Sequence, residues 1–312
     1  MATEAQVRPK PVRRPGDSIF KGLSTGSGVV ILAILAGVAA FLLWQAWPAI
    51  VADPSQVRGG QGLVHYIGPL LYGTVLSAAI ALIIATPLSI GIALFISHYA
   101  PRRLAQALGY LVDLLAAVPS LVFGLWGITV LAPATVPVMQ WLNTYFGWIP
   151  LFGGQPSTTG RTILVVGIVL AVMILPIMTA VNREVFLQTP RLHEEASLAL
   201  GATRWEMIQQ AVIPFGRSGI ISGMMLGLGR ALGETMAVAI ILSPTARYTW
   251  EIISSSNPGT IAGDIALQFP ESSGLDVNTL VASGLVLFAL TLAVNMLARW
   301  IVSRRAEFSG AN

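Results

Sequence analysis

The fold is decided by residues 189–242, which read TPRLHEEASLALGATRWEMIQQAVIPFGRSGIISGMMLGLGRALGETMAVAIIL. The first half is charged and is broken by a glycine, whereas the second half is apolar and rich in glycine. The two flanking apolar segments, Thr162–Val181 and Gly216–Leu242, are each long enough to span a bilayer. The charged half between them must therefore lie at a membrane surface.

The pattern of the charged half predicts two short helices joined at a corner. Thr189 can cap a first helix whose first residue is a proline, a position where the missing N–H does no harm. Gly201 is expected to form the corner. Thr203 and Glu206 have the spacing of a capping box for the second helix, and Pro214 is expected to close that helix.

The composition places the whole chain in a membrane. Hydrophobic residues make up 54% of it and charged residues 10%, with a mean hydropathy of +0.74, whereas charged residues form about a quarter of a soluble protein. There are no cysteines, which excludes disulfides and thiolate metal sites, and the three histidines show no metal-ligand spacing. The sequence predicts an all-α integral membrane protein.

Six apolar segments are long enough to be transmembrane helices, since about 20 helical residues cross the hydrocarbon core. They are residues 28–47, 67–97, 107–131, 162–181, 216–242 and 277–302. The basic residues 1–27 are expected to form a disordered tail, and residues 28–312 a single transmembrane domain. The uncharged loop over residues 132–160 is expected to fold back against the outer membrane face.

The basic residues predict the orientation of these spans. Six spans put both termini on one side, and 14 of the 18 lysines and arginines belong to that side. Arg58, Arg161 and Arg247 lie on the opposite side. Because basic residues favour the cytoplasm, both termini and the charged hairpin are expected to be cytoplasmic. The outer loop 243–276 carries four acidic residues and one basic residue, which indicates a contact with an external binding protein.

The fifth span carries two further features. Gly219, Gly223 and Gly227 recur every four residues, a stripe that lets another helix approach closely. Arg230 and Glu234 would lie one helical turn apart, and an arginine at this depth costs at least about 2.5 kcal/mol unless it has a partner. The pair is either an ion pair that orients the helix, or a guanidinium held by a carboxylate on a substrate pathway. Arginine suits a pathway because its planar fork can donate two hydrogen bonds to phosphate-type oxygens.

Three motifs resemble the permease subunits of ABC importers. Glu195-Ala196, Gly201 and Pro214 have the order and spacing of the family's cytoplasmic coupling loop, which would cover residues 189–214. The other two motifs are similar to the signature of the permeases of the phosphate-specific ABC transporter, most of all the first of its two permeases. They are residues 227–238, GLGRALGETMAV, and residues 113–127, DLLAAVPSLVFGLWG. Asp113 departs from the family's usual glutamate, and Ser197, Ala211 and Ile213 depart within the loop.

This resemblance implies a type I importer fold and a set of partners. The partners would be a second permease in a heterodimer, two copies of an ATPase subunit that grips the coupling loop, and an external phosphate-binding protein. The residues agree that ATP hydrolysis needs another chain, because the only lysines, Lys10 and Lys21, are not followed by the serine or threonine of a P-loop. We expect this subunit to be non-catalytic, to bind no cofactor itself and no nucleic acid, and to leave ATP and Mg²⁺ to the ATPase.

The expected function is import of inorganic phosphate across the cell membrane. Arg230 and Glu234 would line the pathway. Because that pair is neutral overall, an anion needs another cation, expected from the second permease across the glycine stripe. The alternatives are a permease for another oxyanion, such as molybdate or sulfate, and a self-contained secondary transporter or channel, against which the coupling loop stands.

Overall fold

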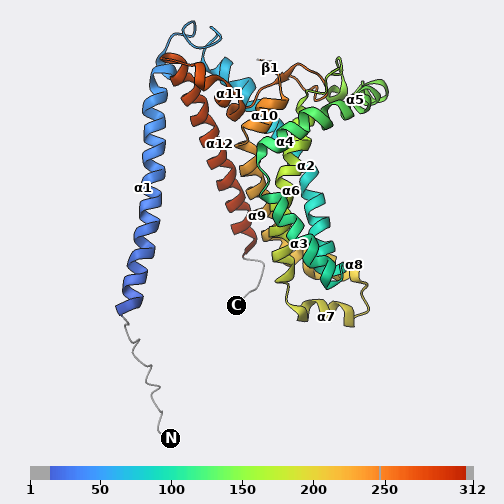
Figure 1. Ribbon diagram of the computed structural model, residues 1–312. Helices are drawn as coiled ribbons and strands as arrows, with labels where there is room; N and C mark the ends of the chain where they lie inside the picture. Colours follow the sequence, from blue (N-terminus) through green and yellow to red (C-terminus); the bar gives the residue numbers. More distant parts are fainter. Residues whose placement is uncertain (1–14, 246, 307–312) are drawn as a thin grey trace.

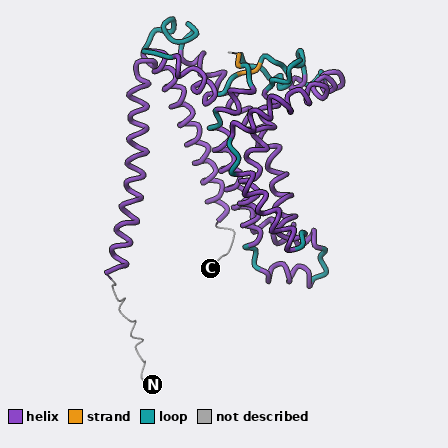
Figure 2. Tube along the Cα trace, in the orientation of Figure 1, coloured by secondary structure: helices purple, strands orange, loops and turns teal. Residues whose placement is uncertain are grey.

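The computed structural model describes residues 15–245 and 247–306, which form a helical bundle (Figure 1). The helices are α1 (Pro15–Val51), α2 (Leu63–Leu94), α3 (Arg102–Ala116), α4 (Ser120–Trp126), α5 (Ala132–Phe146), α6 (Ile163–Leu187), α7 (Arg191–Ala199), α8 (Arg204–Met207), α9 (Ile213–Leu232), α10 (Met236–Ile241), α11 (Ile261–Gln268) and α12 (Leu275–Ala306). Short 3-10 helices cover Pro150–Phe152 and Phe269–Glu271, and π-helical segments cover Phe95–Tyr99, Gly127–Leu131 and Ile208–Val212. Two-residue strands, β1 (Pro244–Thr245) and β2 (Asn257–Pro258), pair in parallel among the loops (Figure 2).

Six helical runs in the described part of the chain are long and apolar enough to cross a membrane. They are Ile19–Val51, Leu63–Tyr99, Ser120–Phe146, Ile163–Leu187, Arg204–Leu232 and Leu275–Ile301. The prediction of an all-α membrane protein with six spans is confirmed, although several boundaries differ from those expected.

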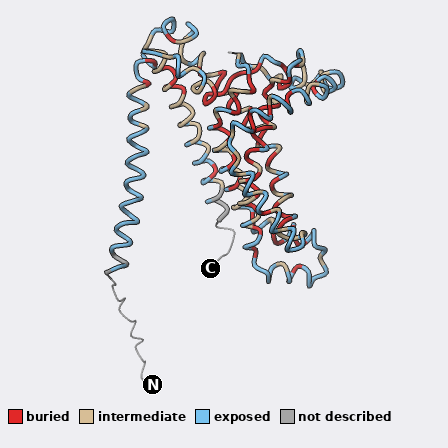
Figure 3. Tube along the Cα trace, viewed as in Figure 1, coloured by how far each residue is buried: buried red, intermediate tan, exposed pale blue. Residues whose placement is uncertain are grey.

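Helix α6 is the centre of the bundle. It packs against α2, α3 and α9, and its apolar residues are buried along most of its length (Figure 3). Close contact with α2 is possible because Gly167 has no side chain, so that Ile80 lies where a Cβ would be, 2.4 Å from its ideal position. The elements that carry the functional residues are therefore built around one buried helix.

The third span departs from the predicted residues 107–131. Helix α3 ends at Ala116, Pro119 has an extended backbone, and a new helix begins at Ser120, because a proline disfavours the helical conformation of the residue before it. Helix α4 then continues through a π-helical segment into α5. The first half of the predicted loop 132–160 is thus helical, and α5 lies across the end of the bundle opposite α7 (Figure 1).

The first span begins earlier than predicted. Residues 1–14 of the expected disordered tail lie outside the described residues, but residues 15–27 belong to α1, in which no proline occurs between Pro15 and Pro48. Helix α1 meets α12 at its C-terminal end, where Gln45 Nε2 donates to Asn278 Oδ1 at 3.3 Å. Most of the remaining length of α1 is exposed (Figure 3).

Candidate functional site

The charged hairpin forms α7 and α8 at one end of the bundle (Figure 1). Helix α7 begins one residue later than predicted, with Pro190 as its N-cap. Gly201 forms the corner with φ +88°, a left-handed backbone that glycine adopts without strain. The capping box is present, because Thr203 Oγ1 accepts from the Glu206 N–H at 3.3 Å and Glu206 Oε2 accepts from the Thr203 N–H at 2.7 Å.

Two polar contacts anchor this hairpin. His98 Nε2, in the π-helical segment that ends α2, lies 3.5 Å from Glu194 Oε1 on α7. Within the hairpin, Ser197 Oγ donates to Gln210 Oε1 at 3.2 Å. The hairpin is thus connected both to the end of α2 and across its own corner, which suits a unit that moves as one piece.

Two leucines of the hairpin are strongly exposed. Leu200 is 90% exposed and Leu192 is 74% exposed, while Glu195 and Ala196 beside them are also exposed. Burying a leucine side chain is worth about 1.5–3 kcal/mol. Exposed leucines at the tip of a charged loop indicate a surface on which another protein docks.

Pro214 does not close the second hairpin helix, contrary to the prediction. Residues 204–232 form one helical run, in which a π-helical segment ends at Val212 and α9 begins at Ile213. Pro214 then lies in the first turn of α9, where its missing N–H is tolerated. The hairpin therefore continues without a break into the membrane helix.

The glycine stripe packs against α6 of the same chain. Gly219, Gly223 and Gly227 all face that helix. An added Cβ at Gly219 would lie 2.3 Å from a methyl carbon of Val185, and one at Gly227 would lie 2.8 Å from Met178 Sδ. The close helical partner is thus α6, so a cation cannot reach Arg230 from another chain across this stripe.

The predicted span 216–242 is interrupted beside Arg230. Helix α9 ends at Leu232 and α10 begins at Met236. Glu234, which is 9% exposed, lies in the interruption, and its Oε1 accepts a hydrogen bond from the Ala237 backbone N–H at 3.0 Å. Glycine weakens a helix, and this carboxylate satisfies an N–H in the first turn of the next one.

Glu234 is consequently a cap for α10 rather than a partner for Arg230. Among the described residues, no ion pair joins Arg230 to Glu234. The prediction that the two lie one turn apart on one helix is wrong for the same reason. The break at Gly233, Glu234 and Thr235 separates the helix of Arg230 from the helix that Glu234 caps.

Arg161 holds the other end of α10. Its Nε donates to the carbonyl oxygen of Ile241 at 3.0 Å, and its Nη2 donates to that of Ile240 at 3.4 Å. A carboxylate at the N-terminus and a guanidinium at the C-terminus both complement the helix dipole. This role could not be predicted from the sequence, because α6, the hairpin and α9 all lie between Arg161 and α10 along the chain.

The two signature motifs meet at α10. A Cβ at Gly124 of α4 would lie 2.9 Å from Ala237 Cα, so the two backbones touch. One turn of chain later, a Cβ at Gly127 would collide with Ile241 and Val169. The glycines of the motif at residues 113–127 therefore let α4 approach the short helix that follows Arg230.

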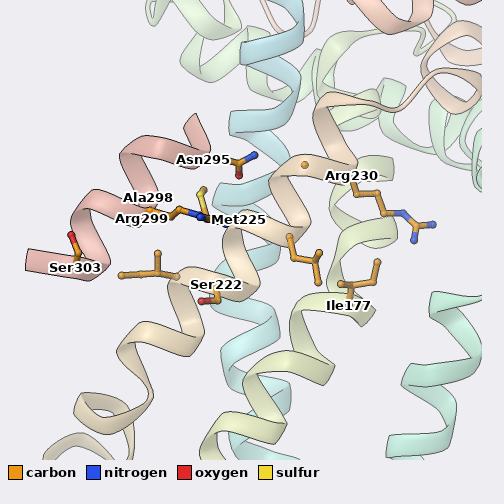
Figure 4. Close-up of a pocket in the computed structure, with 11 residues that line it drawn as sticks. Ile177, Ser222, Met225, Arg230, Asn295, Ala298, Arg299 and Ser303 are labelled. Atoms are coloured by element: carbon orange, nitrogen blue, oxygen red, sulfur yellow. The ribbon is translucent and has the colours of Figure 1, made fainter. Parts of the chain in front are cut away.

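Arg230 lines a groove of about 750 Å³ between α6, α9 and α12 (Figure 4). The polar side chains of the lining are Ser222, Arg230, Asn295, Arg299 and Ser303. The other lining residues are apolar or have no side chain, and the described lining contains no carboxylate. Such a groove carries positive charge without an internal counter-charge, which suits a mobile anion. The described residues also include no group of three or more histidine, aspartate or glutamate side chains that could hold a metal ion.

One acidic residue of the predicted outer contact loop is engaged within the chain. Asp264 Oδ2 accepts a hydrogen bond from the Tyr66 hydroxyl at 2.5 Å, and burial raises the pKa of the Asp264 carboxyl. Arg58 donates to Ser272 Oγ at 3.1 Å and to Gln268. These contacts fix the start of α2 and the loop before it to α11 and the residues that follow α11.

Comparison with known proteins agrees with this arrangement. The model of the family described as "Binding-protein-dependent transport system inner membrane component" matches residues 85–307. The phosphate transport system permease protein PstC 2 of Mycobacterium tuberculosis is 44% identical, with 98% of this chain and 100% of that protein covered. The corresponding protein PstC of Mesorhizobium japonicum is 37% identical, with 95% and 92% covered.

Solved structures share the fold. A chain of a bacterial ABC transporter involved in the import of the acidic polysaccharide alginate has a TM-score of 0.59 at 18% identity, covering 92% of this chain and 96% of that one. A chain of the MetNI methionine ABC transporter in an inward-facing conformation has a TM-score of 0.51 at 18% identity, covering 78% and 95%. The chain therefore belongs to the binding-protein-dependent transport system inner membrane components, the family of ABC transporter permeases in which its curated relatives are phosphate transport system permease proteins.

Proposed function

We propose that this chain is the membrane-spanning permease subunit of an ATP-driven importer that moves inorganic phosphate into the cytoplasm. The observation that carries the proposal is the groove beside the break in the fifth span, where Arg230 lies without a carboxylate partner among the described residues. A guanidinium at that depth is costly, and a phosphate oxyanion can compensate it through two parallel hydrogen bonds. The relatives that bear the name of phosphate permeases support this choice of anion.

The hairpin supports the part of the proposal in which a separate ATPase drives transport. Its exposed leucines, Leu192 and Leu200, lie next to Glu195 and Ala196 and suit contact with an ATPase subunit that binds ATP and Mg²⁺. The run from Arg204 to Leu232 connects the second helix of the hairpin to Arg230 without a break. Two ATPase subunits, a second permease and an external phosphate-binding protein complete the proposed importer.

Phosphate uptake tests this proposal. The chain is purified with its neighbours, reconstituted in liposomes and supplied with external binding protein and radiolabelled phosphate, with and without internal ATP. ATP-dependent uptake that sulfate and molybdate do not suppress is expected. Uptake without ATP would indicate a secondary transporter, and suppression by either competitor would indicate another oxyanion.

Arg230 tests the pathway itself. A hydrogen bond to a charged group is worth about 1.5–3 kcal/mol, so Arg230→Gln should lower the initial uptake rate by about ten-fold or more in an assembled complex. Arg230→Lys keeps the charge but loses the fork and should lower it less. Arg217→Gln removes an exposed cation at the start of α9 and serves as the control. Wild-type uptake in the Arg230→Gln complex would remove Arg230 from the pathway.

The proposed orientation places both termini and the hairpin in the cytoplasm, because 14 of the 18 basic residues belong to that side. Protease added to spheroplasts with a sealed cell membrane should cleave a site inserted at Ser255 and should leave tags at residues 1 and 312 uncut. Cleavage of either terminal tag would overturn the orientation.

A further inference from the structure

Anion transport through the groove needs more positive charge than Arg230 supplies. Phosphate carries one to two negative charges near neutral pH, and a bare anion in a low-dielectric site is strongly disfavoured. The sequence suggested that another chain would bring a second cation across the glycine stripe, but the stripe is covered by α6. The groove contains a second guanidinium of this same chain, that of Arg299.

We propose that Arg299 on α12 is the second phosphate-binding cation of the groove, with Asn295 and Ser303 beside it as hydrogen-bond donors. This inference rests on the proposed function and names the residue that binds the anion after Arg230. All three residues belong to α12 and line the same groove as Arg230. The lining thus holds two guanidinium groups, and its described residues include no carboxylate that would neutralise them.

The orientation of the two side chains indicates successive sites rather than one clamp. Figure 4 shows Arg299 extending from α12 toward Met225 of α9, while Arg230 extends to the other side of α9. Met225 precedes Arg230 by five residues, which corresponds to about 7.5 Å along the helix toward the hairpin end. The anion can therefore move from Arg230 toward the hairpin end and meet Arg299 there.

The groove is open at Gly229, one residue before Arg230. Gly229 lines the groove and has no side chain, and no atom lies within 4 Å of the place where its Cβ would be. An anion that leaves Arg230 meets no side chain at this position. The other role open to Arg299 is that of a basic anchor at a cytoplasmic helix end, but its side chain turns toward α9 (Figure 4) rather than along α12.

The experiment measures ATP-dependent uptake of inorganic phosphate by the complete reconstituted complex. We expect Arg299→Gln to lower the maximal uptake rate by about ten-fold, the effect of losing about 1.4 kcal/mol. Arg299→Lys should fall between Arg299→Gln and wild type. Arg217→Gln, which removes a cation outside the groove lining, should transport at close to the wild-type rate.

The pH dependence separates anion binding from a structural role. Arginine stays charged at all accessible pH values, and the described lining has no other titratable side chain, so the substrate alone changes charge. The ratio of Arg299→Gln uptake to wild-type uptake should therefore fall as pH rises and phosphate becomes a dianion. A ratio that does not change with pH, or an uptake equal to that of Arg217→Gln, would overturn the proposal.

A second variant, in which the guanidinium is moved to a neighbouring position, tests the proposal if the Arg299→Gln complex fails to assemble. Ser303 lies one turn away on α12 and lines the same groove, so Ser303→Arg in the Arg299→Gln background returns a guanidinium to it. Recovery of both assembly and uptake supports the proposal, and assembly without uptake refutes it. Absence of uptake in the wild-type complex would instead refute the proposed function, which distinguishes the two failures.

Discussion

The helical run Arg204–Leu232 ends in two different ways. At the hairpin end it passes from α8 to α9 through a π-helical segment without a break, although Pro214 predicts one. At the groove end it stops at Leu232, although the predicted span continues for ten more residues to Leu242. A displacement of the hairpin is therefore expected to reach Arg230 along a continuous helix and to stop at Gly233.

Beyond the groove end, α10 is held by the rest of the chain. Glu234 caps its first turn, Arg161 binds its last carbonyl oxygens, and Gly124 lets α4 touch its backbone. The two ends thus divide the fifth span into a part that can move with the hairpin and a part fixed by its neighbours. The arginine that we place on the phosphate pathway lies at the boundary between them.

The largest expected effect comes from separating this run from α6. Gly219→Ala places a methyl group 2.3 Å from Val185, and overpacking of this kind costs about 1–3 kcal/mol. The melting temperature and the yield of the assembled complex should both fall. Gly91→Ala on α2 is the matched control, because no atom lies within 4 Å of its added Cβ. Equal melting temperatures for the two variants would show that the contact with α6 does not hold the run.

Much of the hairpin end could be predicted from the sequence because its signals are local. The capping box of Thr203 and Glu206 needs only a spacing of three residues, and the left-handed corner needs only a glycine at 201. The six spans follow from apolar length alone. The continuation through Pro214 could not be predicted, since it depends on where a π-helical segment resets the hydrogen-bond register.

The groove end depends on contacts between distant segments. The predicted span 216–242 contains Gly233, Glu234 and Thr235 at the break, but these residues alone do not show that the helix stops there. The short helix that follows is held from outside by Arg161 and α4. Arg299 lies in a basic C-terminal cluster, which in the sequence predicts only that this end of the chain is cytoplasmic. Only the packing of α12 beside α9 shows that it shares a groove with Arg230.

The next effect tests the hairpin end. Gly201→Val forces a β-branched residue to φ +88°, which costs about 1–3 kcal/mol, while no neighbouring atom lies within 4 Å of the added Cβ. The protein should insert but lose ATP-driven phosphate uptake, because the corner no longer presents α7 to the ATPase. Gly201→Asn tolerates the left-handed backbone and should keep most of the uptake. Normal uptake in the valine variant would refute a rigid hairpin.

The smallest effect tests the groove end, where two roles of Glu234 make different predictions. If the residue caps α10, Glu234→Ala should cost about 1 kcal/mol, because it leaves the Ala237 N–H without its acceptor. Glu234→Gln keeps an acceptor oxygen and should lose only the charge–dipole contribution, about 0.3–1 kcal/mol.

If Glu234 instead orients Arg230 through its negative charge, glutamine should be as harmful to uptake as alanine, because both remove the charge. Melting temperature and initial uptake rate are measured for both variants in the assembled complex. If Glu234 caps α10, the Glu234→Ala variant should have a lower melting temperature and a lower initial uptake rate than the Glu234→Gln variant. Equal loss of uptake in both variants, with an unchanged melting temperature, would contradict the capping role and would indicate that Glu234 orients the Arg230 guanidinium. That role requires the break at Gly233 to close during transport, so that the two side chains come together.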